Sequence, residues 1–204
     1  MRVVAGSARG RRLLAPKGRQ VRPTSDRVRE AVFNALGSLG VIEGAAVVDL
    51  FAGSGALGIE ALSRGAATAT FVEVDPRALD SVRTNLAATA LGARATVVTA
   101  DALHWLGAAT SRAGVRFDVA LVDPPYSFSA WDVLLAVVPA DLAVVESDRA
   151  IEPGEGWAVL RRKAYGTTVV TIIRRHQPSP SAGAPGPSTS EPTTPEPDTS
   201  GHKE

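Results

Sequence analysis

The chain has 204 residues, of which 45% are hydrophobic and 21% charged, and its formal net charge at pH 7 is +1. This composition is ordinary for a globular protein with one well-buried domain and an appendage; no apolar run approaches the roughly 20 residues of a membrane-spanning helix, and the N-terminus lacks the apolar segment of a secretory signal. Cysteine is absent and the three histidines are scattered, so we expect a cytoplasmic protein without disulfides, a metal site or a thiol nucleophile.

Basic residues crowd the first 29 positions, where nine Lys and Arg residues stand against a single acid, Asp26. Such a block is typical of a segment that binds a polyanion, although a solvated basic N-terminus explains the charge equally well. Gly, Arg and short apolar runs over residues 1–20 predict a short β-hairpin or an extended arm. Arg22-Pro23-Thr24-Ser25-Asp26 then predicts a helix start, with a helical apolar stripe that continues to Leu36.

Strands and helices alternate over the next hundred residues. Strands are expected at 45–50, 68–74, 95–99, 117–122 and 142–145, and helices at 57–63, 76–87, 102–109 and 129–138. This alternation implies βαβ units and a doubly wound, mostly parallel α/β sheet with helices on both faces. Two further strands, 157–160 and 167–173, predict an antiparallel edge and complete a seven-stranded sheet.

The composition changes at Pro178, because seven of the 14 prolines lie from this residue onward and Val, Ile, Leu, Met and aromatic residues are absent there. Such a segment buries too little apolar surface to offset the entropy of ordering it. We therefore expect a domain over 1–177, made of a basic N-terminal arm and helix (1–40) and a Rossmann-like core (41–177), followed by a disordered Pro/Ser/Thr-rich tail (178–204).

The stretch from Asp49 to Gly58 reads as a strand end, a glycine turn and a helix start. Glycines allow positive φ and close approach of a ligand, and the helix start offers N–H groups to an anionic ligand group. Residues 53–58 also match the G-x-G-x-x-G fingerprint of dinucleotide sites, with Glu73 where the ribose-binding acid is expected.

Three features argue against a nicotinamide or flavin enzyme. Asp49, four residues before Gly53, would repel a pyrophosphate and suits a cationic amine or sulfonium. Asp101 follows the third strand and has the chemistry to accept from an adenine amino group. The fourth strand ends in Asp-Pro-Pro-Tyr (123–126). All these residues follow the carboxyl ends of parallel strands, where open α/β sheets bind ligands.

The Asp-Pro-Pro-Tyr sequence has a physical logic of its own. Two prolines stiffen the backbone, so the Asp123 carboxylate and the Pro124 carbonyl become rigid acceptors. Hydrogen bonds from an exocyclic NH₂ to such a pair draw its nitrogen toward sp³ geometry and expose the lone pair to an electrophile. Tyr126 offers a face for base stacking, worth about 1–3 kcal/mol. A structural turn with a core tyrosine is the alternative, which the preceding acids and glycines disfavour.

The motifs D-x-F-x-G-S-G, F-V-E-x-D and D-P-P-Y resemble those of class I S-adenosylmethionine-dependent methyltransferases that act on exocyclic amines. Residues 4–13, 22–34 and 49–66 are more specifically similar to the RsmD-type 16S ribosomal RNA guanine-N2 methyltransferases. The resemblance extends from residue 2 to about residue 175 and leaves out the tail.

This resemblance implies transfer of a methyl group from S-adenosylmethionine to guanine N2 in 16S rRNA, within the small ribosomal subunit or its assembly intermediates, without a metal or a membrane. It assigns cofactor binding to Asp49, Phe51, Gly53, Gly55, Glu73, Val74 and Asp101. It assigns the catalytic turn to Asp123, Pro124, Pro125 and Tyr126. It assigns RNA binding to Arg9, Arg11, Arg12, Arg22 and Arg27.

Other functions are compatible with parts of the sequence. A DNA methyltransferase for adenine-N6 or cytosine-N4 shares the Asp-Pro-Pro-Tyr logic, and a non-catalytic rRNA-binding assembly factor would share the basic arm. Cytosine-C5 methylation through a thiol is excluded by the absence of cysteine, and Asp123 in place of Asn disfavours a glutamine-N5 protein methyltransferase. Glu146 ends the fifth strand near these sites and is either a substrate contact or a solvated strand end. Arg161-Arg162-Lys163 is either a second RNA contact or a charged turn.

Overall fold

The computed structural model describes residues 1–16, 26–110 and 114–176. Its strands are β1 (Ala46–Leu50), β2 (Thr68–Glu73), β3 (Ala95–Thr99), β4 (Phe117–Val122), β5 (Ala140–Ser147), β6 (Trp157–Tyr165) and β7 (Thr168–Arg175). Its helices are α1 (Asp26–Ser38), α2 (Ala56–Ser63), α3 (Pro76–Thr89), the short 3₁₀ turn η1 (Gly92–Arg94), α4 (Ala102–Thr110) and α5 (Trp131–Val137).

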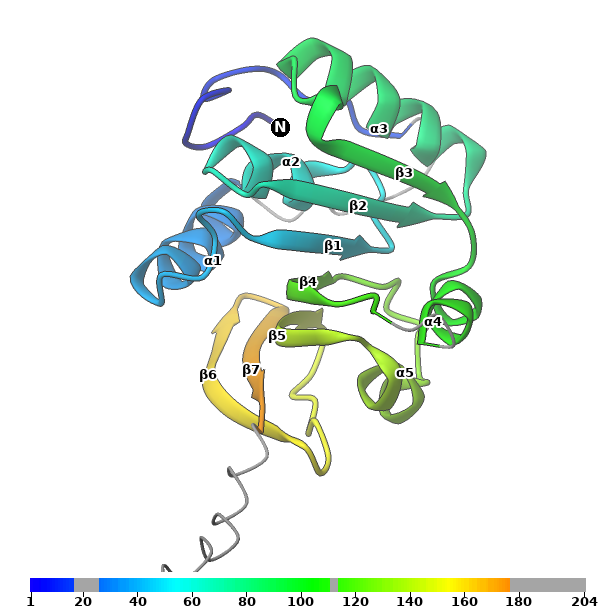
Figure 1. Cartoon of the computed structure of the whole chain (residues 1–204). Coiled ribbons are helices and arrows are strands. Elements are labelled where there is room, and N and C mark those ends of the chain that lie inside the picture. Colours follow the sequence, from blue (N-terminus) through cyan, green and yellow to red (C-terminus); the bar gives the residue numbers. More distant parts are fainter. Residues whose placement is uncertain (17–25, 111–113, 177–204) are drawn as a thin grey trace, which may run out of the picture.

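The seven strands form one sheet in the order β3-β2-β1-β4-β5-β7-β6, from β3 at the top of Figure 1 to the β6–β7 hairpin at the bottom. The first five strands are parallel, and β7 pairs antiparallel with both β5 and β6. The chain order reverses between β1 and β4, and ligands bind at such a switch point in open α/β sheets. The expected mostly parallel sheet with an antiparallel edge is confirmed.

Each face of the sheet carries its own apolar core, because successive strand side chains point to opposite faces. Val47 of β1 and Phe71 of β2 pack with apolar residues of α1, α2 and α3. Val48 and Leu50 lie on the other face with residues of α4 and α5. Helices therefore cover both faces, as doubly wound topology requires.

The N-terminal arm, residues 1–16 as described here, folds back on itself and docks on the core. Arg2 and Arg12 form an antiparallel bridge, and the Val3 N–H donates to the Arg11 carbonyl at 2.9 Å. At Gly6, with φ +84°, an added Cβ would lie 1.8 Å from the backbone oxygen of Ser63. Only glycine allows the arm to lie this close to α2.

Buried polar groups fasten this arm to the helices. The Glu60 carboxylate accepts from the N–H groups of Val4 and Ala5 at 2.8 and 3.0 Å. It also pairs with Arg29 of α1, at 3.5 Å, and both side chains have no solvent exposure. Removing one partner of such a pair would leave a buried charge. The hairpin alternative for the arm is therefore supported over residues 1–16, and the arm is docked rather than solvated.

Some expected boundaries shift. Strand β6 continues to Tyr165 instead of ending at Leu160, so the charged-turn interpretation of Arg161-Arg162-Lys163 is wrong. Helix α5 begins at Trp131 rather than at residue 129. Arg22, the capping residues before Asp26 and the tail from Pro178 lie outside the described residues. None of the helices in the described parts is long and apolar enough to cross a bilayer.

Candidate active site

The sheet register brings the predicted acids to one edge. Leu50 of β1 pairs with Val72 of β2 and with Val122 of β4. Val122 in turn pairs with Val145 of β5. The residues that follow these strand positions, among them Glu73, Asp123 and Glu146, therefore stand at the same level on neighbouring strands. Strands about 4.8 Å apart place such residues side by side.

A cavity of about 1050 Å³ opens along this edge. Nearly all the residues that were expected to bind the cofactor or to form the catalytic turn line it: Asp49, Phe51, Gly53, Glu73, Val74, Asp101, Asp123, Pro124, Pro125 and Tyr126. Gly55 does not line it. The volume of the cavity is at the upper end for small-molecule sites, which leaves room for two ligand groups side by side.

The glycine turn, residues 51–55, takes an unusual backbone path. Gly53 and Gly55 have φ of 56° and 76°, and Phe51 has φ 60° although it carries a side chain. Left-handed backbone is uncommon outside glycine and is often found where a site requires it. Gly55 stands just before α2 as its N-cap. The role of Gly55 in the structure is therefore to turn the chain into the helix.

Gly58, the third glycine of the motif, sits where α2 crosses the sheet. A Cβ there would lie 2.4 Å from Phe71 Cε1 and 3.1 Å from Asp49 Oδ2. The Gly58 N–H donates to Asp49 Oδ2 at 2.9 Å. The close approach of helix and strand thus lets a backbone amide satisfy a buried carboxylate.

Glu73 is almost fully occupied by backbone donors. Its Oε2 accepts from the Gly53 N–H at 2.9 Å, and its Oε1 accepts from Val74 and Asp75, both at 2.8 Å. A carboxylate has about four acceptor positions, so this side chain ties the glycine turn to the end of β2. Val74, beside it, leaves 59% of its surface exposed at the cavity.

Asp49 lies at the base of the cavity and is only 1% exposed. Burial raises the pKa of its carboxyl well above the ordinary value; the Gly58 hydrogen bond opposes this, while Asp123 and Glu73 raise the pKa further. A buried acid with acidic neighbours is stabilised in its ionised form by a cation. The cavity floor is therefore suited to a positively charged group.

The Asp-Pro-Pro-Tyr turn (123–126) lies beside the glycine turn, because the two turns follow the neighbouring strands β4 and β1. The Phe128 N–H donates to the Pro125 carbonyl at 2.8 Å, which closes the turn. The Phe128 ring packs edge-on against Phe51 at 5.3 Å and Trp131 at 5.1 Å between centroids. These contacts fix the turn to the glycine loop on one side and to α5 on the other. Tyr126 is half exposed at the cavity.

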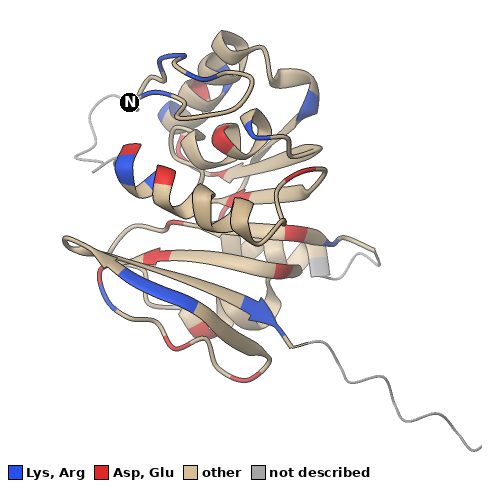
Figure 2. Ribbon diagram, turned by 90° about the vertical axis from the view of Figure 1, so that its left-hand side faces the viewer, with Lys and Arg blue, Asp and Glu red and all other residues tan. Residues whose placement is uncertain are grey.

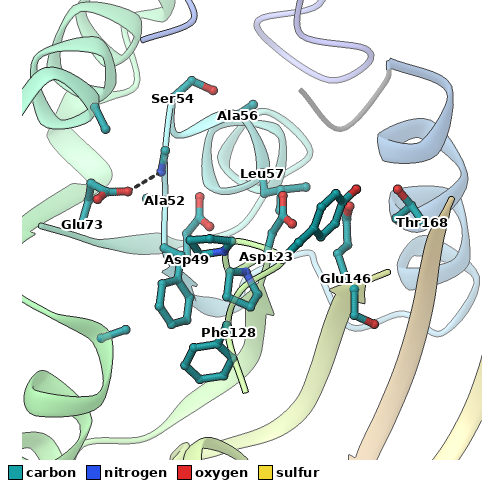
Figure 3. Close-up of a pocket in the computed structure, with 18 of the residues that line it drawn as sticks. Asp49, Ala52, Ser54, Ala56, Leu57, Glu73, Asp123, Phe128, Glu146 and Thr168 are labelled. Atoms are coloured by element: carbon teal, nitrogen blue, oxygen red, sulfur yellow. Dashed lines mark hydrogen bonds between the residues drawn. The ribbon is translucent and has the colours of Figure 1, made fainter. Parts of the chain in front are cut away.

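The remaining wall comes from elements that the sequence motifs do not mark. Figure 3 shows Asp123 between Asp49 and Glu146, with Thr168 of β7 farther along. Glu146 is 3% exposed and lines the cavity. Lys163 and Arg27 also line it. This end of the cavity is therefore built by β5, the β6–β7 hairpin and α1.

The other predicted positions fall in two groups. Asp101 Oδ1 accepts from the His104 N–H at 3.0 Å and so caps α4. Arg9, Arg11 and Arg12 are exposed on the docked arm, and Figure 2 shows basic residues both on the arm and along β6. Among the residues in the described ranges, no group of His, Cys, Asp or Glu side chains is arranged to hold a metal ion.

Asn85 of α3 is a structural contributor that the sequence analysis did not identify. Its Nδ2 donates to the carbonyls of Ser54 and Leu14, both at 2.9 Å, and its Oδ1 accepts from the Leu14 N–H at 2.8 Å. This buried amide holds the glycine turn and the arm together. The signal for this role in the sequence was a polar residue within the apolar stripe of the helix predicted at 76–87.

Comparisons with known proteins agree with this geometry. The model of the family described as "Conserved hypothetical protein 95" matches residues 1–174. "Putative rRNA methyltransferase YlbH" of Bacillus subtilis (strain 168) is 40% identical over 185 residues, which cover 86% of this chain and 99% of that protein. "Ribosomal RNA small subunit methyltransferase D" of Escherichia coli (strain K12) is 35% identical over 185 residues, with 86% and 90% covered.

A solved structure has the same fold over most of its length. "Putative methyltransferase yhhF from Escherichia coli" superimposes with a TM-score of 0.74 and 36% sequence identity, covering 86% of this chain and 97% of that one. The chain therefore belongs to the conserved hypothetical protein 95 family, the family of the RsmD-type class I methyltransferases that its sequence motifs resemble.

Proposed function

We propose that the protein transfers a methyl group from S-adenosylmethionine to the exocyclic N2 amine of a guanine in 16S rRNA of the small ribosomal subunit. The observation that carries this proposal is the placement of the Asp-Pro-Pro-Tyr turn beside Asp49 and the glycine turn in one cavity. That arrangement sets a pair of amine acceptors next to a site suited to a cation. The family and the names of its relatives support rRNA as the substrate class.

The residues of the cavity fit S-adenosylmethionine. The buried carboxylate of Asp49 suits the positive charge of its methionine part. Gly53 lets the ligand approach the backbone closely. The exposed side chain of Val74 offers an apolar face to adenine. The second oxygen of Asp101, beyond the one that caps α4, accepts from the adenine amino group.

Glu73 has a positioning role as well as a ligand role in this proposal. Its hydrogen bonds to Gly53 and Val74 hold the glycine turn against β2. One acceptor position of the carboxylate then remains to receive a ribose hydroxyl. Phe51 and Gly55 act indirectly, because Phe51 packs on Phe128 and Gly55 turns the chain into α2.

On the other side of the methyl group, Asp123 and the Pro124 carbonyl hold the flipped guanine by its N2 hydrogens. Pro124 is buried and Pro125 is exposed, and both fix the backbone of the turn. Tyr126 stacks on the base. When bound, S-adenosylmethionine supplies an electrophilic methyl: the C–N bond forms as the C–S bond breaks, S-adenosylhomocysteine leaves, and N2 releases one proton.

The proton from N2 goes to water or to the Asp123 carboxylate. Alignment of the amine with the methyl supplies much of the rate enhancement. The exposed Arg9, Arg11 and Arg12 of the arm, together with Arg22 and with Arg27 at the cavity, bind phosphates of the rRNA.

Product identity tests the proposal directly. The protein is incubated with methyl-labelled S-adenosylmethionine and, in separate reactions, naked rRNA, small-subunit particles and duplex DNA, and the products are digested to nucleosides. We expect N2-methylguanosine from a ribosomal substrate. N6-methyladenine or N4-methylcytosine from DNA would replace the proposal by a DNA methyltransferase, and the absence of transfer would favour an assembly factor.

Asp123→Ala separates catalysis from cofactor binding. We expect methyl transfer to fall by at least about a thousandfold, since a catalytic group in a preorganised site has effects of this order. Cofactor affinity measured by calorimetry should stay within a few-fold. Asp80→Ala is the matched control, because the Asp80 side chain is exposed on α3, where it forms a surface ion pair with Arg83. Turnover that survives in Asp123→Ala would show that the amine acceptor has been assigned wrongly.

A further inference from the structure

Glu146 is a buried carboxylate in the cavity wall that lies outside the three sequence motifs described above. It is 3% exposed. It is the second-last residue of β5 and pairs in the sheet with Val170 of β7. Its position beyond Asp123, away from Glu73, is clear in Figure 3. This residue therefore faces the half of the cavity that receives the base.

The strand order determines the order in which hydrogen-bonding side chains line the part of the cavity beyond Asp123. Asp123 follows β4, Glu146 ends the neighbouring β5, and Lys163 lies on β6 of the adjoining hairpin. The Lys163 Nζ lies 5.2 Å from the centroid of the Tyr165 ring, and both residues line the cavity. The wall thus presents two acceptors followed by a donor.

The Watson–Crick edge of guanine has the complementary order. N2–H₂ is a donor, N1–H is a donor and O6 is an acceptor. Adenine presents an N1 acceptor and an N6 donor, and cytosine presents two acceptors before its N4 donor, so neither matches. A flipped base is read by hydrogen bonds to this edge. With N2 held by the Asp-Pro-Pro-Tyr turn, the next position along the edge is N1.

We infer that Glu146 is a specificity-determining residue, which accepts the N1–H of the target guanine and rejects purines that lack this hydrogen. The inference rests on the proposed guanine-N2 activity and adds how the base is chosen. With an analogue whose N1 is an acceptor, the Glu146 carboxylate would face another acceptor in place of the guanine N1–H, and such mismatches give large discrimination.

The test uses a purine that keeps the reacting amine and changes only its neighbours. 2,6-Diaminopurine has the same N2 amine but an N1 acceptor and a 6-amino group. Once the wild-type reaction has located the methylated guanine, RNA with guanine or 2,6-diaminopurine at that one position is assembled into small-subunit particles. Initial rates of transfer to the two substrates are compared for wild type and Glu146→Gln.

Wild type is expected to prefer guanine by about a hundredfold or more. Glu146→Gln loses the charge-assisted acceptor and gains an NH₂ that can face an N1 acceptor. Its rate on guanine should fall by about ten- to a hundredfold, and the guanine to diaminopurine ratio should fall by at least about tenfold. Glu155→Gln is the matched control, because Glu155 is exposed in the loop before β6.

Two outcomes overturn the inference. The first is that the wild-type enzyme methylates both purines at similar rates, a result that overturns the inference without any variant. The other is a Glu146→Gln protein whose rates fall equally on both substrates, with the ratio unchanged, since this would show a structural role only. If wild type instead makes no N2-methylguanosine from any ribosomal substrate, the proposed function itself fails, and the two failures are distinguishable.

Discussion

The two halves of the cavity are built in different ways. Around the glycine turn, carboxylates are bonded to backbone amides: Asp49 to Gly58, and Glu73 to Gly53, Val74 and Asp75. Around the Asp-Pro-Pro-Tyr turn, side chains from separate elements converge, and Tyr126 is half exposed. We call these the cofactor half and the base half.

This difference matches the ligands that we propose for them. A small molecule of fixed shape is served by a preorganised pocket whose backbone is locked. A base that arrives on a large RNA needs an open wall with groups placed to read its edge. Substitutions in the cofactor half should therefore affect both folding and cofactor binding, whereas those in the base half should affect transfer and leave the fold intact.

Gly58→Ala is the strongest challenge to the cofactor half. The added Cβ would lie 2.4 Å from the Phe71 ring, and overpacking of this kind costs about 1–3 kcal/mol. We expect a lower melting temperature and a large loss of cofactor affinity, measured by thermal denaturation and calorimetry. Gly107→Ala in α4 is the control, because a Cβ there would meet no atom within 4 Å from the rest of the described chain outside its own helix turn. Equal behaviour of the two variants would refute the tight-packing interpretation.

Tyr126→Ala should show the opposite pattern in the base half. Loss of a stacking face worth about 1–3 kcal/mol predicts a ten- to hundredfold drop in kcat/KM for the RNA substrate. Tyr126→Phe keeps the ring and should stay near wild type. Neither variant should change the melting temperature or the cofactor affinity. A drop in Tyr126→Phe equal to that of Tyr126→Ala would mean that the hydroxyl, not the ring, is the functional group.

The arm extends the base half to the rest of the RNA. Replacing Arg9, Arg11 and Arg12 together by Ala removes three exposed charges. If each contacts one phosphate, the slope of log affinity against log salt should decrease in magnitude by about 2–3. Filter binding at several salt concentrations measures this slope. An unchanged slope would place the RNA elsewhere, with the basic stretch of β6 as the next surface to test.

Asp49→Asn should change the stability of the fold only slightly, and with the opposite sign to Gly58→Ala. Folding raises the pKa of this buried acid, so the folded state loses stability as pH rises from the ordinary Asp range toward the raised pKa. The Asn oxygen can still accept from Gly58. We expect the ligand-free variant to melt a few degrees higher than wild type at pH 8, with a smaller difference at pH 4, and to lose stabilisation by S-adenosylmethionine. A lower melting temperature at pH 8 would contradict this reasoning.

The sequence predicted the fold well, because its strands and helices have strong, regular patterns. Predicted strand ends were wrong where a strand continued into exposed polar residues. An example is β6, which continues through Arg161 and Lys163. The acids at the strand ends could be predicted from position alone. The hydrogen-bond partners of these acids could not be predicted, since the bond between Glu73 and Gly53 joins residues 20 apart in the chain. Glu146 stood out only as a strand end until the register placed it level with Asp123.

The docking of the arm has a consequence for the order of folding. Its hydrogen bonds to Glu60, Ser63 and Asn85 join residues that are 55 to 71 positions apart. Contacts of such long range form only after the intervening chain has been organised, because loop closure must precede them. The arm is synthesised before α2 and α3, but it reaches its native place only after these helices exist. The basic surface that we propose for RNA is therefore assembled by the folded core.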